Sequence, residues 1–271
     1  MSPRHSEYIL TPLAEVMTEA SHALSNVGKG FGSYPLKEYF LRALFLKMTG
    51  AQEQKCKCIC WDIATYDYTY RYETFSNWSL GECSRLADKN SVANSLLRRV
   101  SDDYELVDLQ KQNIINGVNL KLKDFYDRCS ILGWPKYEFT EFVKLYSNMT
   151  PSCLLIKNSN SGKNVSWEIL RGQCEGCPNA KSKKKPNACT SKLRKGWSDI
   201  YLRAVYVHRN ECAHNTLSCQ MNRPTFGELT SYEMCYNNYY LRFAILSIID
   251  EILMALYKEW LKNVSGNRIF T

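Results

Sequence analysis

A short run near residue 210 combines side chains that can move protons with one that can hold phosphate. The run RNECAH at 209–214 contains Arg209, Asn210 and His214. On an α-helix, Tyr206, Asn210 and His214 share one line, and Arg209 is rotated from His214 by about 140°. Imidazole titrates near neutral pH and acts as base or acid, whereas guanidinium stays charged and grips two phosphate oxygens. The pattern favours acid–base chemistry on a phosphate ester, but a histidine at a helix end also simply complements the helix dipole.

The elements around this run are predicted to be long helices. Residues 197–215 read as one helix, and the break at 222–224 contains Pro224. A final helix follows, with apolar residues alternately four and three apart at Leu241, Ile245, Ile248, Ile252 and Ala255. This seam predicts packing in the core or against a second subunit.

The order of these features resembles that of the HEPN superfamily. Arg209, the adjacent polar Asn210, three more residues and then His214 are similar to the Arg-x4–6-His signature of that family. In the family, the motif lies on a late helix of a four- or five-helix core, and a long final helix follows it. The resemblance is close over the motif and loose over roughly residues 197–262. It implies an all-α, HEPN-like helical bundle.

The resemblance also implies an activity and a role for each residue. Members with this motif are typically metal-independent ribonucleases that dimerise with their motifs face to face. Transferred by position, His214 is the acid/base residue, Arg209 the phosphate clamp and Asn210 the residue that orients them, with no cofactor for catalysis. The implied function is an endoribonuclease that cleaves RNA by 2′-hydroxyl attack at a composite homodimer site, in defence or toxin-type RNA cleavage. An antitoxin or regulatory protein is a further implied partner.

Two alternatives to this function remain open from the sequence. The first is a non-catalytic HEPN-type module that binds a nucleotide or RNA through the same groove. The intact set of Arg209, Asn210 and His214 argues against it. The second is a zinc-stapled nucleic-acid-binding protein whose lysine-rich loop is the functional surface.

Two stretches are predicted to interrupt a single helical domain that spans residues 1–271. In residues 51–80, the tyrosines at 66, 68, 70 and 72 alternate as on a strand, so we expect a β-hairpin or irregular insertion after a helix over 35–48. Residues 151–196 predict a small β-hairpin followed by a loop rich in cysteine and lysine. Thr11-Pro12 predicts a helix start, with Thr11 as N-cap.

The second insertion contains two further candidate sites. Cys174 and Cys177 form a Cys-x2-Cys pair, and Cys153 and Cys189 would complete an all-cysteine structural zinc site that staples the loop. Free surface thiols are the alternative. The basic residues of the loop predict RNA phosphate contacts or a solvated segment; they are Lys183, Lys184, Lys185, Lys192 and Arg194.

Composition limits the class of protein. The chain has 35 Lys and Arg against 27 Asp and Glu, a net charge of +8 that favours an anionic partner such as RNA. Hydrophobic residues make up 45%, which is ordinary for a globular domain. The most apolar stretch, 244–256, is interrupted by Asp250 and Glu251 and is too short to span a bilayer. We therefore expect no membrane contact, a cytoplasmic location and reduced cysteines.

Overall fold

The computed structural model describes residues 3–27, 34–75, 83–100, 108–128, 155–156, 167–168, 201–214 and 239–266. Its longer helices are α2 (Leu13–Ser25), α3 (Tyr34–Tyr66), α5 (Leu86–Leu97), α6 (Asp108–Arg128) and α11 (Tyr239–Gly266). The shorter elements are α1 (Pro3–Leu10), α4 (Tyr68–Tyr70), α9 (His208–Ala213), the π-helical segments η2 (Arg71–Phe75) and η6 (Leu202–Val207), and the strands β1 (Leu155–Ile156) and β2 (Trp167–Glu168). The predicted all-α class is confirmed for this part of the chain.

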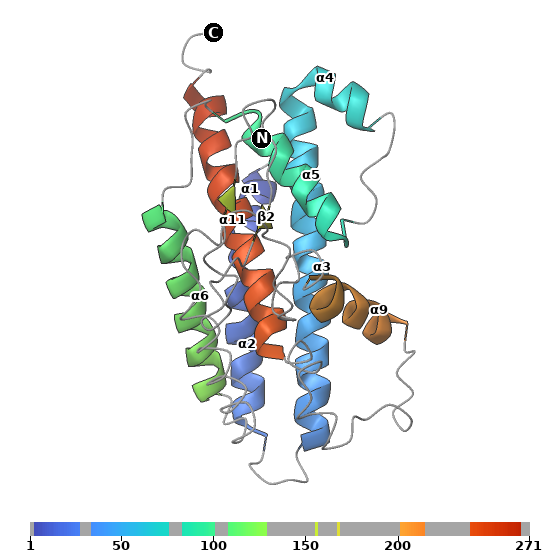
Figure 1. Cartoon of the computed structure of the whole chain (residues 1–271), viewed down its shortest axis with the longest axis vertical. Helices are drawn as coiled ribbons and strands as arrows, with labels where there is room; N and C mark the ends of the chain where they lie inside the picture. The colour runs from blue at the N-terminus through green and yellow to red at the C-terminus, as the bar shows by residue number, and fades with distance from the viewer. Residues whose placement is uncertain are drawn as a thin grey trace, which may run out of the picture.

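Helices α2, α3, α6 and α11 form the body of the described protein (Figure 1). The central helix α11 packs against α6 on one side and α3 on the other, and α2 packs against the same two helices. Helix α5 covers α3 and α11, and α1 contacts both of them. These contacts close a bundle in which each long helix buries an apolar face against two neighbours.

Helix α11 is buried on nearly every side because it stands in the middle of this bundle. Ile245, Ile248 and Ile252 of the predicted seam are 0–2% exposed. Phe243 and Leu256, which lie off that seam, are also buried. A helix that is apolar all round belongs inside a core. The seam of α11 therefore packs within the chain.

The predicted β or irregular insertion at 51–80 is wrong over its described residues, 51–75, which are helical. Helix α3 continues through Gly50, which has open space around its Cα, and ends at Tyr66. The chain restarts as α4 when the Asp67 side chain accepts a hydrogen bond from the Tyr70 backbone N–H at 2.9 Å. This restart leaves Tyr68 and Tyr72 exposed and Tyr70 buried. The alternating tyrosines therefore mark a break between helices.

The three cysteines of α3, Cys56, Cys58 and Cys60, are all buried. Burial raises the pKa of Cys60 to about 12 and that of Cys56 still higher, so both thiols stay protonated. They are packing residues.

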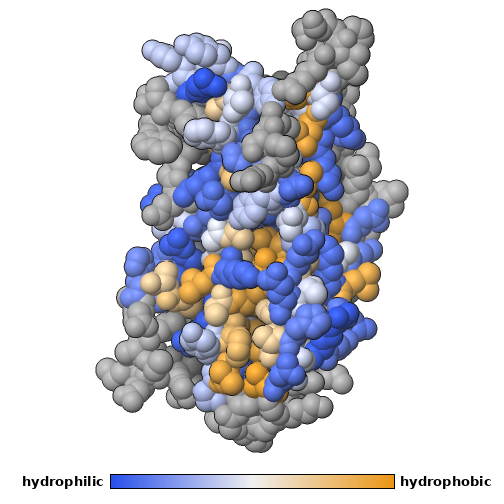
Figure 2. All heavy atoms as spheres, turned by 180° about the vertical axis from the view of Figure 1, so that it is seen from behind, coloured by the Kyte–Doolittle hydropathy of each residue, from blue (hydrophilic) through white to orange (hydrophobic). Residues whose placement is uncertain are grey.

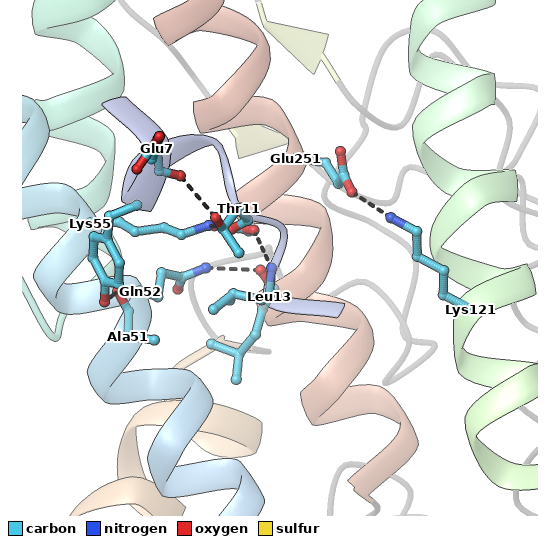
Figure 3. A network of polar contacts seen from close by, with 11 residues as sticks. Glu7, Thr11, Leu13, Ala51, Gln52, Lys55, Lys121 and Glu251 are labelled. Atoms are coloured by element: carbon cyan, nitrogen blue, oxygen red, sulfur yellow. Dashed lines mark hydrogen bonds and ion pairs between the residues drawn. The ribbon is translucent and has the colours of Figure 1, made fainter. Parts of the chain in front are cut away.

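The start of α2 is fixed by a contact from the other end of the chain. Pro12, not Thr11, is the N-cap, and no side chain of its own caps the helix. The Leu13 N–H donates instead to Asp250 Oδ2 of α11 at 2.8 Å. Lys55 Nζ of α3 donates to the other Asp250 oxygen at 2.7 Å and to the Thr11 carbonyl. Figure 3 shows Lys55 reaching across to this first turn.

Strands β1 and β2 form a short antiparallel pair. Leu155 pairs with Glu168 and Ile156 with Trp167 in antiparallel register, inside the segment 151–196 for which a small β-hairpin was predicted. Seen from behind, apolar side chains gather over the middle and lower part of the protein, bordered by hydrophilic ones (Figure 2). Among the helices of the described ranges, none combines the length and apolar character that crossing a bilayer requires.

Candidate active site

The predicted motif lies on a short helix that is held against α3. Residues 201–214 are helical, first as η6 and then as α9. Figure 1 shows α9 on the outer side of α3. Ala204 and Val205 anchor η6 in the core, 0% and 1% exposed. A π-helical turn spreads its backbone carbonyls, and Arg242 Nε of α11 donates to the Ala204 carbonyl at 2.8 Å. This hydrogen bond ties the motif segment to α11.

The inner face of α9 carries His208, which is 8% exposed. Its ring lies 5.2 Å from the Phe45 ring and 5.6 Å from the Tyr239 ring, between centroids. Nε2 lies 3.3 Å from the Tyr239 hydroxyl and 3.5 Å from Cys212 Sγ. Tyr239 in turn donates to Glu38 of α3 at 3.3 Å. The two successive contacts, His208 with Tyr239 and Tyr239 with Glu38, therefore link α9, α11 and α3.

The charge state of His208 follows from this environment. Burial, together with the nearby Arg242 and Arg42, lowers its pKa from 6.5 to about 3. The ring is therefore neutral at physiological pH. His208 is a structural residue, although it lies next to the arginine of the motif.

The outer face of α9 carries Arg209 and Asn210. Arg209 donates to Asn210 Oδ1 at 3.2 Å and to Glu53 Oε2 of α3 at 3.3 Å. The side chains of Arg209 and Glu53 are 21% and 13% exposed, so the pair is partly open to solvent. A guanidinium carries five N–H donors in a planar fork, and this geometry matches the oxygens of a phosphate.

A second guanidinium reaches the same face from α5. Asn210 and Arg85 both hydrogen-bond to the Tyr206 hydroxyl, and these bonds lower the pKa of Tyr206. The same contact with Tyr206 raises the pKa of Arg85. Arg85, Tyr206, Asn210, Arg209 and Glu53 thus form a continuous chain of contacts from α5 to α3, the Arg209 network.

His214 lies at the C-terminal end of α9, where its backbone N–H donates to the Asn210 carbonyl at 2.9 Å. Its side chain is exposed. Within the described part of the chain, no hydrogen bond or ion pair joins its ring to Arg209 or Asn210. Among these three residues of one short helical segment, a side-chain hydrogen bond joins only Arg209 and Asn210.

The other predicted sites lie outside the residues that the structure describes. Cys153, Cys174, Cys177 and Cys189 of the zinc prediction lie outside the described residues. So do the loop residues Lys183, Lys184, Lys185, Lys192 and Arg194. Within the ranges that the structure does describe, no group of three or more His, Cys, Asp or Glu is arranged to hold a metal ion.

Two residues of the Arg209 network were not predicted from the sequence. Glu53 comes from the middle of α3 and Arg85 from the start of α5. Neither belongs to a motif, and Glu53 lies in a stretch predicted to be irregular. Glu53 reaches the site because α3 packs against α9, and Arg85 reaches it because the segment before α5 contacts Tyr201 and Tyr206.

The chain matches no protein-family model, no curated protein and no solved structure. The class that the described residues define is an all-α bundle that presents an arginine, an asparagine and a histidine on one short outer helix.

Proposed function

We propose that this protein is a HEPN-like, metal-independent endoribonuclease. The observation that carries the proposal is that Arg209 and Asn210 are half-buried and His214 is exposed at the end of α9, while the neighbouring His208 is buried. The motif residues that chemistry on a phosphate ester requires are thus those that water reaches. The bundle, with the motif on a late helix before the long α11, supports the same proposal.

The proposed reaction needs three groups. A base removes the proton from a ribose 2′-hydroxyl, whose oxygen then forms a bond to the adjacent phosphorus. The bond from phosphorus to the 5′ oxygen breaks, and an acid protonates that oxygen. The products are a 2′,3′-cyclic phosphate and a 5′-hydroxyl. His214 is the proton carrier, and Arg209 stabilises the charge on the phosphate oxygens.

One histidine cannot perform both proton transfers in the same step, so we propose a homodimer with a composite site. The exposed ring of His214, at the end of α9 and outside the Arg209–Asn210 contact, supports this arrangement. A second copy would supply the second imidazole. An unrestrained ribonuclease would damage its host, so we place the activity in defence or toxin-type RNA cleavage, with an antitoxin or regulatory protein as partner.

One observation favours a second candidate, a HEPN-type module that binds RNA or a nucleotide without cleavage. Arg209 is already paired with Glu53, whose carboxylate would repel a phosphate at the same position. In a catalytic site this pair must open when RNA binds.

The test is cleavage of labelled total RNA in EDTA by the wild type, His214→Ala and the matched control His22→Ala. His22 is an exposed histidine on α2. We expect cleavage by wild type and His22→Ala, cyclic phosphate ends, and a loss of about 10²-fold or more for His214→Ala. Cleavage by His214→Ala at the wild-type rate contradicts the proposal. RNA binding without cleavage by any of the three proteins supports the binding module.

A further inference from the structure

The segment that leads into α5 is held against the motif segment by contacts to its backbone. The Tyr201 hydroxyl, at the start of η6, donates to the Ser84 carbonyl at 2.9 Å. The buried Lys89 ammonium donates to the Cys83 carbonyl at 2.7 Å. In Figure 1, the lower end of α5 lies close to α9, beside the middle of α3. The next residue, Arg85, is the N-cap of α5 and is therefore held beside the motif.

Arg85 brings a second guanidinium to the Arg209 network. Its side chain is exposed. A hydrogen bond with the Tyr206 hydroxyl raises the pKa of Arg85. Tyr206 precedes Asn210 by four residues, so the two lie on one side of the motif segment. Asn210 accepts the hydrogen bond from Arg209 at 3.2 Å. Both guanidinium groups thus belong to one set of contacts.

A third cation, Lys57, stands on α3 one turn after Glu53, the residue that pairs with Arg209 at 3.3 Å. Residues four apart share one side of a helix, about 6 Å apart along its axis. Burial raises the pKa of the Cys83 thiol, whereas the nearby charge of Lys57 lowers it. The exposed Lys57 therefore lies between Glu53 and the segment that leads into α5. We call Lys57, Arg85 and Arg209 the three-cation surface.

The charge of this surface is only partly compensated. Glu53 pairs with Arg209, and the Asp88 carboxylate accepts a hydrogen bond from the Arg85 backbone N–H at 3.2 Å. Among the ion pairs of the described residues, none includes Lys57 or the Arg85 side chain. Cations held together on a surface repel one another, and a bound anion relieves this repulsion.

The arrangement of the cations favours RNA as that anion. They come from three different elements, α3, α9 and the start of α5, so together they suit a ligand with several separate negative charges. Guanidinium and ammonium groups both bind phosphate oxygens, and such contacts position a strand without reading its bases.

We infer that Lys57 and Arg85 bind the RNA phosphates that flank the phosphate held by Arg209. This inference rests on the proposed function, because it takes Arg209 as the phosphate clamp. Each phosphate contact releases counterions, so each of the two residues contributes to the salt dependence of binding.

The test measures binding of a fluorescent single-stranded oligouridylate by anisotropy at several salt concentrations, with the full chain and with His214→Ala in every protein to prevent cleavage. Lys57→Gln and Arg85→Gln are compared with Lys123→Gln, which removes the same charge. Lys123 is exposed on α6, and Figure 1 shows α6 on the opposite side of the bundle from α9.

We expect Lys57→Gln and Arg85→Gln each to raise Kd several-fold. Each should also reduce the slope of log Kd against log salt concentration by about 0.7, the value for one phosphate contact in a single strand. Lys123→Gln should leave the slope unchanged. The charge-conserving variants Lys57→Arg and Arg85→Lys should restore most of it.

The outcomes separate this inference from the proposed function. If Lys57→Gln and Arg85→Gln reduce the slope no more than Lys123→Gln does, the inference is overturned, even if the wild type cleaves RNA. It is also overturned if the parent does not bind the oligonucleotide. Weaker binding of polyglutamate but not of RNA by the two variants would identify an acidic protein as the partner and overturn it too. If the wild type never cleaves RNA, but these two variants alone reduce the slope, the ribonuclease proposal fails and the three-cation surface stands.

Discussion

Two polar networks meet on α3, and they differ in their access to water. The first, the Lys55 network, joins Lys55 to Asp250, Thr11 and Leu13. The side chains of Lys55 and Asp250 are 4% and 1% exposed. The second, the Arg209 network, pairs Arg209 with Glu53 at 21% and 13% exposure. Glu53 and Lys55 are only two residues apart, so they point to different sides of one helix.

The comparison distinguishes a network that stabilises the fold from one that could bind a ligand. In the Lys55 network both oxygens of Asp250 are bonded to protein groups, which leaves no place for a ligand. A buried charge that loses its partner lowers the free energy of unfolding by several kcal/mol. The network therefore stabilises the fold only when both Lys55 and Asp250 are present. In the Arg209 network, water already reaches both charges. A phosphate can therefore replace the carboxylate of Glu53 at small cost.

The largest effect is expected from Asp250→Asn, which leaves the Lys55 ammonium buried without a counter-charge. The free energy of unfolding should fall by about 3–5 kcal/mol. The control is the neighbouring Glu251→Gln, because Glu251 pairs with Lys121 at 3.0 Å on the surface, at 27% and 46% exposure (Figure 3). That pair should contribute less than about 1 kcal/mol. Urea unfolding measures both; equal losses would contradict the comparison.

The next effect concerns pH and the inner face of α9. The pKa of His208 is near 3 in the folded state and 6.5 in the reference state. As pH falls below about 6.5, His208 becomes protonated in the unfolded chain but stays neutral in the folded chain. This one group then lowers stability by about 1.4 kcal/mol per pH unit, until the pH nears about 3.

His208→Gln should remove this dependence. Unfolding free energies measured by urea at about pH 7 and about pH 5 should differ less in His208→Gln than in the wild type. His22→Gln, at an exposed position, should keep the wild-type slope. An unchanged slope in His208→Gln would show that the ring is protonated inside the fold.

The smallest effect on stability is expected from Glu53→Gln, which removes the carboxylate opposite Arg209. The free energy of unfolding should change by less than about 1 kcal/mol. RNA should bind a few-fold more tightly, because Arg209 no longer has to leave an ion pair. Glu19→Gln makes the same change in net charge at the exposed Lys47–Glu19 pair, 2.7 Å apart. If both variants bind RNA equally well, net charge explains the gain and the Glu53 pair does not restrain the site.

Part of this fold was predictable because apolar periodicity records which side of a helix is buried. The final helix, with Ile245, Ile248 and Ile252 in the core, follows from that pattern. The helical motif around Arg209 follows in the same way, over residues 201–214. The stretch at 51–75 was mispredicted because its tyrosines at 66, 68, 70 and 72 alternate as they would on a strand. In the structure they lie on both sides of the helix restart at Asp67.

By itself, the sequence determined the all-α class, the helical position of the motif, and the common line of Tyr206 and Asn210, because these depend on residues close together in the chain. Only the tertiary structure decided that His208 is buried and His214 exposed, because the sequence does not distinguish a buried histidine from an exposed one. It also decided that Asp250 caps α2 and that Glu53 and Arg85 join the motif. Such contacts between distant segments are selected by packing of the whole bundle, which no local pattern records.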